Sequence, residues 1–151
     1  MMWATGRGRA FTFVELILVV ALIAVLATLS IPQFRKTADN FALDSFSKDI
    51  YYLCRYLQAE AIAQSVVLCL RFSLERDGLQ AAYLDKPLTG RYGKVYKFPA
   101  GVEAIILPNN EGGIYFYPDG STDEVTITFK NRHERQVTLV MQGAAGEIKM
   151  Q

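Results

Sequence analysis

The sequence predicts an α+β fold in which one long N-terminal helix is followed by a small antiparallel β-sheet or sandwich domain. Two patterns along its 151 residues predict it. Up to about residue 65, apolar residues are first nearly continuous and then recur every three or four positions, which is the helical period. From residue 66 the period falls to two and turn residues become frequent, which is typical of short strands. We therefore expect a helical part up to about residue 65 and a β domain over residues 66–151.

The composition is that of a globular protein with a modest core. Hydrophobic residues make up 51% and charged residues 21% of the chain, and the formal net charge is +1. A near-neutral chain does not favour nucleic acid or an acidic partner. Cys54 and Cys69 are too few for a disulfide framework or a structural zinc site. Their spacing is compatible both with one bridge outside the cytosol and with two buried thiols.

The first helical segment has the length and polarity of a membrane span. Only Thr28 and Ser30 interrupt the apolar side chains of residues 16–31, and no basic residue lies inside this segment. A helix over residues 11–31 is about 31 Å long. This length matches the hydrocarbon core of a bilayer, which is about 30 Å thick.

One carboxylate, that of Glu15, interrupts the start of this apolar segment. Three interpretations compete. A secretory signal peptide would be cleaved after Ala27. A plain membrane anchor leaves Glu15 unexplained, because carboxylates inside a membrane normally have a partner. In the third, a short basic leader is removed by cleavage between Ala10 and Phe11.

The third interpretation rests on a resemblance. A basic leader with Arg7 and Arg9, a small residue, the run Phe-Thr-Phe-Val-Glu and a long apolar stretch together resemble the start of a type IV prepilin or pseudopilin. The resemblance implies that a prepilin peptidase cleaves between Ala10 and Phe11, at a site where the family usually has Gly before the cut. It also implies that the new N-terminus at Phe11 is N-methylated. Residues 1–10 are then a leader peptide, and residues 11–31 are a transmembrane and filament-core helix.

The resemblance also gives Glu15 a partner and Pro32 a role. Cleavage creates an amine at Phe11, and in a filament this amine of one subunit can lie beside the Glu15 carboxylate of its neighbour. Each charge is costly alone in apolar surroundings, so their pairing favours assembly in one register. In the alternative, Glu15 lies at headgroup depth and is favoured by the helix dipole. Pro32 corresponds to a proline that bends the helix in this family, because proline removes a backbone donor.

Residues 32–65 are predicted to continue the helix as an amphipathic helix, with one apolar and one charged face. The following apolar residues recur at spacings of three and four and are separated by charged ones: Phe34, Ala38, Phe41, Ala42, Phe46, Ile50, Leu53, Leu57 and Ala61. We expect the helix to end near Gln64 and its apolar stripe to pack on the domain that follows.

Residues 66–151 are predicted to form the antiparallel β domain. The strand-like runs are 66–72, 79–84, 94–98, 102–107, 114–117, 125–129, 137–141 and 147–150. Glycine, proline and asparagine mark turns between them, including one at Pro87. Short strands with this spacing indicate antiparallel sheets, and the apolar stripe of the helix would cover one face.

Within the pilin superfamily, the chain is most similar to the minor pseudopilin H of type II secretion and its FimT-like relatives. The specific similarities are Leu-Gln-Ala-Glu-Ala-Ile-Ala at 57–63, the strand at 66–72 and Ile-Tyr-Phe-Tyr-Pro-Asp-Gly-Ser at 114–121. This implies a single-pass bacterial inner-membrane protein with its C-terminal domain in the periplasm. Its partners would be other pseudopilins in a filament, the prepilin peptidase and inner-membrane lipid. The alternative is a FimT-like minor pilin of a type IV pilus with a DNA-binding role.

No catalytic set emerges from the sequence, so we expect a structural protein without a cofactor or metal rather than an enzyme. His133 lies between two strand-like runs, which is typical of a solvated hairpin turn. Asp119, Asp123 and Glu124 carry oxygens that calcium prefers, but their spacing matches no known loop. A tight turn explains Asp119 as well.

The same hairpin offers a candidate DNA-binding patch. Arg132 and Arg135 flank His133, which gives a local cluster of basic groups. Glu134 interrupts the cluster and the domain is near neutral, so DNA binding is the less favoured interpretation.

Overall fold

The computed structural model describes residues 12–72, 77–83, 86–88, 90, 92–108 and 113–151, with the backbone alone at 28–32, 86 and 87. The contacts divide the chain into two units, residues 1–37 and residues 38–151, and each is described by itself. The predicted leader peptide and the cleavage site between Ala10 and Phe11 lie outside the described residues.

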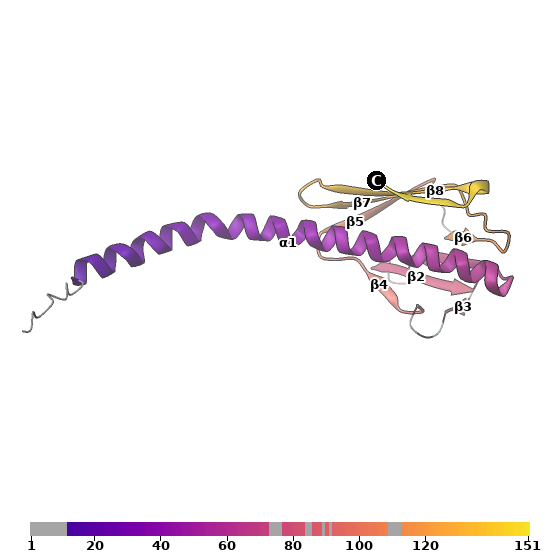
Figure 1. Cartoon of the computed structure of the whole chain (residues 1–151), viewed down its shortest axis with the longest axis horizontal. Helices are drawn as coiled ribbons and strands as arrows, with labels where there is room; N and C mark the ends of the chain where they lie inside the picture. Colours follow the sequence, from indigo (N-terminus) through magenta and orange to yellow (C-terminus); the bar gives the residue numbers. More distant parts are fainter. Residues whose placement is uncertain (1–11, 73–76, 84–85, 89, 91, 109–112) are drawn as a thin grey trace, which may run out of the picture. The chain divides into compact units, whose positions relative to one another are not determined.

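One helix, α1, runs from Phe13 to Gln64 (Figure 1). The Thr12 hydroxyl accepts a hydrogen bond from the Glu15 amide at 3.3 Å, which caps the first turn of the helix. At the other end Ser65 adopts a φ of 55°, and the Val66 amide donates to the Ala61 carbonyl at 3.2 Å. This pattern closes a helix through a left-handed residue. The helix continues through Pro32, and the predicted bend there stays a prediction.

Two antiparallel sheets follow α1. The first contains β1 (Leu68–Phe72), β2 (Gly78–Tyr83), β3 (Lys86–Pro87), β4 (Val95–Lys97) and β6 (Ile114–Phe116) in the order β3-β2-β1-β6, with β4 also paired to β2. The second contains β5 (Val102–Leu107), β7 (Val125–Asn131), β8 (Gln136–Gln142) and β9 (Glu147–Met150) in the order β5-β7-β8-β9. A short 3₁₀ helix, η1 (Gly143–Ala145), joins β8 to β9. The predicted α+β fold is confirmed.

Strand β3 was not predicted, because Pro87 was interpreted as a turn residue. Its two residues pair with Ala82 and Tyr83 of β2. Proline cannot donate to a ladder and is therefore tolerated at a sheet edge, where one side of the strand needs no partner. A two-residue strand also leaves no alternation that a sequence pattern could reveal.

The core of residues 38–151 lies between α1 and the two sheets. Its helical contribution is a stripe spaced by three and four residues: Leu43, Phe46, Ile50, Leu53, Cys54, Leu57 and Ala61. The sheets contribute the inward side chains, among them Leu68, Leu70, Ile114, Phe116, Ile127, Phe129, Leu139 and Met141. The Phe46 and Phe129 rings meet edge to face, with their centroids 5.3 Å apart.

The predicted helical stripe was wrong at its first three positions. Phe34, Ala38 and Phe41 were assigned to it, but all three are exposed, Phe41 by 75%, and Leu43 is buried instead. Leu43 precedes Phe46 by three residues and Ile50 by seven, so it shares their face at 3.6 residues per turn. Phe41 precedes Phe46 by five residues, which rotates it well away from that face.

Cys54 and Cys69 are both buried and no disulfide joins them. Burial raises the pKa of the Cys54 thiol to about 12. Folding therefore disfavours the thiolate. The free energy of unfolding is unaffected by this thiol below pH 9 and decreases as the pH rises from 9 toward 12, because the unfolded chain then loses the proton more readily.

We predict that Cys54 is unreactive in the native protein at pH 8, because the thiolate is the nucleophile and it scarcely forms there. The measurement is iodoacetamide labelling of a Cys69→Ala variant, followed by intact mass. The same variant unfolded in urea should label completely. Native labelling at the unfolded rate would contradict the burial of this thiol.

Candidate functional site

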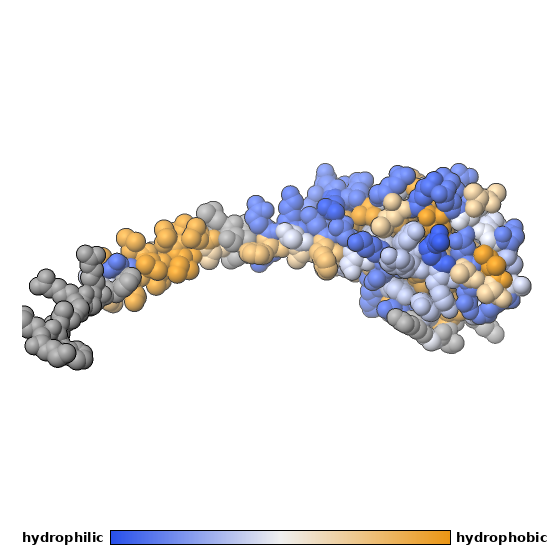
Figure 2. Space-filling model, viewed as in Figure 1, coloured by the Kyte–Doolittle hydropathy of each residue, from blue (hydrophilic) through white to orange (hydrophobic). Residues whose placement is uncertain are grey.

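The most unusual surface of the chain is the first part of α1, residues 13–27, which we call the exposed helix segment. Its large apolar side chains are all exposed, from 41% at Val19 to 77% at Phe13. Figure 2 shows hydrophobic colouring along the face of this segment that is in view. A surface helix of a soluble domain normally hides one apolar stripe and keeps its other face polar. This segment is apolar all round, so it requires lipid or another protein around it.

The only charged side chain in the exposed helix segment is that of Glu15. The Thr12 side chain caps its backbone amide, not its carboxylate. Within the described part of the chain, no ion pair is recorded for the Glu15 carboxylate. Its predicted partner, the Phe11 amine of a neighbouring subunit, lies outside the described residues and stays a prediction.

Among the described residues, no helix holds a stretch that is both long and apolar enough to cross a membrane. The predicted span over residues 11–31 includes Phe11 and the side chains of residues 28–31, which lie outside that description. The membrane span therefore stays a prediction.

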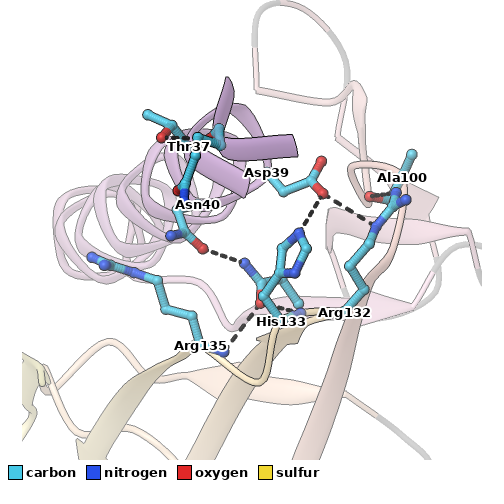
Figure 3. A network of polar contacts seen from close by, with 9 residues as sticks. Thr37, Asp39, Asn40, Ala100, Arg132, His133 and Arg135 are labelled. Carbon is cyan, nitrogen blue, oxygen red and sulfur yellow. Dashed lines mark hydrogen bonds and ion pairs between the residues drawn. The ribbon is translucent and has the colours of Figure 1, made fainter. Parts of the chain in front are cut away.

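The turn between β7 and β8 is attached to α1 by what we call the hairpin network (Figure 3). Its centre is the buried Asn131, whose Nδ2 donates to Asn40 Oδ1 at 2.8 Å. Asn131 Oδ1 accepts from the backbone amides of His133 at 2.9 Å and Arg135 at 3.1 Å. One amide side chain therefore shapes the turn and bonds it to the helix.

Ion pairs complete the hairpin network. Asp39 Oδ2 lies 3.0 Å from His133 Nε2 and 3.3 Å from Arg132 Nε. Arg135 contacts both oxygens of Asp44, with Nη2 at 2.8 Å and Nε at 3.2 Å. A two-point contact of this kind fixes the guanidinium orientation.

This geometry bears on the DNA-binding interpretation. The three basic side chains of the predicted patch, Arg132, His133 and Arg135, all face carboxylates of α1. The two arginines are paired with the carboxylates of Asp39 and Asp44, and Arg132 Nη2 also donates to the Ala100 carbonyl oxygen at 3.2 Å. The hairpin is therefore better described as an attachment to α1 than as an open cationic surface.

A second attachment, the Gln58 bridge, lies farther along α1. Gln58 Nε2 donates to the carbonyl oxygens of Gly120 at 2.8 Å and Gly146 at 2.6 Å. Both glycines have positive φ, 87° and 61°. The bridge joins two segments that the sequence singled out, residues 57–63 and 114–121, and adds the turn before β9.

Two of the three acidic candidates for calcium, Asp119 and Asp123, make hydrogen bonds within the local fold. Asp119 Oδ1 accepts from the Ser121 amide at 2.9 Å and hydroxyl at 2.6 Å, and these bonds hold the pKa of its carboxyl below its usual range. The Asp123 carboxylate accepts from the Tyr115 amide at 3.0 Å and the Tyr117 hydroxyl at 3.2 Å. Across the described residues, no group of three metal-binding side chains is assembled.

Solved structures with the same fold are pilin-like proteins. The minor pseudopilin EpsH from the type 2 secretion system of Vibrio cholerae matches with a TM-score of 0.62 and 13% identity, over 72% of this chain and 95% of that one. A second EpsH structure gives 0.60 and 13%, over 75% and 94%. The type IV minor pilin FimU of Pseudomonas aeruginosa gives 0.58 and 17%, over 76% and 92%.

No protein-family model matches the chain, and no curated protein does either. At these identities the structural matches establish the fold. The predicted resemblance to minor pseudopilins and minor pilins is confirmed at that level, as a long N-terminal helix followed by two antiparallel sheets.

Proposed function

We propose that the chain is a minor pseudopilin, a structural subunit of a type II secretion pseudopilus that takes part in protein secretion across the outer membrane, and that it has no catalytic role. One observation carries this proposal. The exposed helix segment is apolar on every side and belongs to the same helix that packs a complete core over residues 43–61. A folded domain joined to a helix that needs apolar partners is what a filament subunit requires.

In the proposed sequence of events, this helix first anchors the subunit in the membrane and then packs in the filament core. After prepilin peptidase cleaves between Ala10 and Phe11 and the new terminus is methylated, residues 11–31 hold the subunit in the inner membrane. The β domain then lies in the periplasm. Moving the exposed helix segment from lipid into a filament core exchanges one apolar environment for another, so little hydrophobic free energy opposes it. Packing between the helices and the charges near the N-terminus then determine how the subunits are arranged in the filament.

Glu15 is the group that makes this arrangement specific. Apolar side chains pack in many registers, whereas a carboxylate inside an apolar bundle is stabilised only where a cation meets it. The Phe11 amine of the neighbouring subunit is the cation we propose. The bond would form between chains, in agreement with the absence of a recorded partner for Glu15 within the described residues.

A second candidate is a FimT-like minor pilin of a type IV pilus, which the similarity to FimU favours. It shares the exposed helix segment and Glu15 and differs in the partner subunits. Its DNA-binding form is less favoured, because Arg132 and Arg135 are paired with Asp39 and Asp44. Identifying the subunits that copurify with the chain separates the two candidates.

The test has two measurements in the native host. Mass spectrometry of the mature chain is expected to find a methylated Phe11 terminus. Cross-linking in cells is expected to capture neighbouring pilin-like subunits. We expect Glu15→Gln to lower this capture at least about tenfold, because removing one member of a buried ion pair costs about 3–5 kcal/mol.

The matched control is Glu103→Gln, which removes an exposed carboxylate from β5 and should leave capture unchanged. Undiminished capture in Glu15→Gln would remove the register role. A mature terminus at Thr28 would show instead that the segment is a cleaved signal peptide, and the proposal would fail.

A further inference from the structure

A pocket of about 290 Å³ lies between α1 and the strand β4, entirely within residues 38–151. We call it the tyrosine pocket. It is lined by Asp49, Tyr52, Leu53, Tyr56, Tyr92, Lys94 and Tyr96. Neither the hairpin network nor the Gln58 bridge uses these residues, and the proposed filament role does not require them.

Most of the pocket is held in place by ring packing. Tyr56 and Tyr92 are stacked with their centroids 3.7 Å apart and their planes 20° apart. The Lys94 ammonium lies 4.7 Å above the centre of the Tyr96 ring. Leu53, which also lines the pocket, belongs to the buried core. A pocket ordered in this way loses little conformational entropy when a ligand binds.

Three polar side chains of the pocket, Asp49, Tyr52 and Lys94, can form hydrogen bonds with a ligand. Tyr52 is 66% exposed and its ring meets Tyr51 edge to face at 5.4 Å. Among the described residues, no hydrogen bond is recorded for the Asp49 carboxylate or the Tyr52 hydroxyl, and no carboxylate pairs with Lys94. The pocket therefore presents an acceptor, a donor and a hydroxyl that serves as either.

These groups narrow the chemical class of the ligand. One carboxylate and one ammonium make the lining neutral overall, so Asp49 opposes an anion and Lys94 opposes a cation. A wholly apolar ligand would remove both charges from water without giving them partners, which is costly. A neutral molecule with apolar faces and many hydroxyls meets neither objection. Its C–H faces can lie on the tyrosine rings while its hydroxyls bond to Asp49, Lys94 and Tyr52.

We propose that the tyrosine pocket binds a neutral saccharide of one or two sugar rings. The volume is near the lower limit for small-molecule pockets, which begin at about 300 Å³, so longer chains would extend into solvent past Tyr52. The site is independent of the filament role, and either proposal can fail without the other.

The test is saturation-transfer NMR on the full chain in a non-ionic detergent without a sugar headgroup. Cellobiose, maltose and chitobiose serve as probes, with choline chloride and inorganic phosphate as cationic and anionic competitors. We expect transfer to the ring C–H protons of at least one disaccharide. Neither choline nor phosphate should displace it.

Four substitutions test whether the sugar binds in the tyrosine pocket. Tyr52→Ala should weaken the affinity about tenfold, since it removes an aromatic face. Tyr52→Phe should weaken it less, because the ring remains, and Asp49→Asn should reduce it by an intermediate factor. Phe41→Ala removes another exposed aromatic ring of α1 outside the pocket and should change nothing. Tyr52 is exposed, so its substitution is not expected to unfold the domain.

The proposal is overturned by any of three results. These are the absence of transfer to all three disaccharides, unchanged binding in Tyr52→Ala, and displacement of the sugar by choline or phosphate. Displacement by choline would assign the rings to a cationic ligand instead, and displacement by phosphate would assign Lys94 to an anionic one.

Discussion

Replacing Gly146 by Ala is expected to destabilise the β domain by about 2–4 kcal/mol. A Cβ at this position would lie 2.2 Å from the Gly120 carbonyl oxygen and 2.7 Å from Gln58 Nε2. The residue also has a φ of 61°, which non-glycine residues adopt at a cost of about 1–2 kcal/mol. The carbonyl belongs to the backbone, so it moves away only if the 117–121 turn shifts. The Gln58 bridge would then be lost.

The measurement is urea unfolding of the full chain in a mild detergent, followed by near-ultraviolet circular dichroism. Gly90→Ala is the matched control. Gly90 has a φ of 87° but nothing within 4 Å of its added Cβ. It should cost only the backbone strain, about 1–2 kcal/mol. Equal effects of the two substitutions would show that the close approach of Gly146, Gly120 and Gln58 does not contribute.

Replacing Phe129 by Ala is expected to cost about 3–5 kcal/mol. Its side chain is fully buried in β7 and meets the Phe46 ring edge to face. The substitution removes the ring, leaves a cavity and takes away the contact with the Phe46 ring of α1. The same urea experiment measures it, because both the midpoint and the slope of the transition are recorded.

Phe41→Ala is the control for Phe129, since it removes the same atoms from a side chain that is 75% exposed. We expect it to change the stability by less than about 0.5 kcal/mol. A cost near that of Phe129 would mean that Phe41 is covered in the protein under study, which would contradict its exposure.

The features that follow local periodicity were predictable. Strand β7 alternates between buried and half-buried residues along its whole length, and its run was recognised from that alternation. The end of α1 was placed correctly because Gln64 is the last residue before the period changes. Strand β3 was missed because two residues have no period. Phe34, Ala38 and Phe41 were misassigned because their spacings of four and three have the helical period of the buried stripe.

The attachments of the β domain to α1 were not predictable from spacing. Asn131 and Asn40 are 91 residues apart, and Gln58 and Gly146 are 88 apart. No local pattern signals such a contact, since it depends on how both sheets pack. The run at 114–121 was noticed as a similarity to relatives, yet its bond to Gln58 emerged only from the fold. The exposed helix segment, by contrast, was evident from composition, because it has only one charged residue.

The positions of the two attachments determine how the β domain would respond to force. Asn40 and Gln58 are separated by about 27 Å along α1 at the rise of an α-helix. The part of the buried stripe from Leu43 to Leu57 lies between them. A pull along the helix axis would load the hairpin network, the stripe and the Gln58 bridge in shear, so they would have to yield together. A pull across the axis would open them one after another, so the domain should resist axial load far better than lateral load.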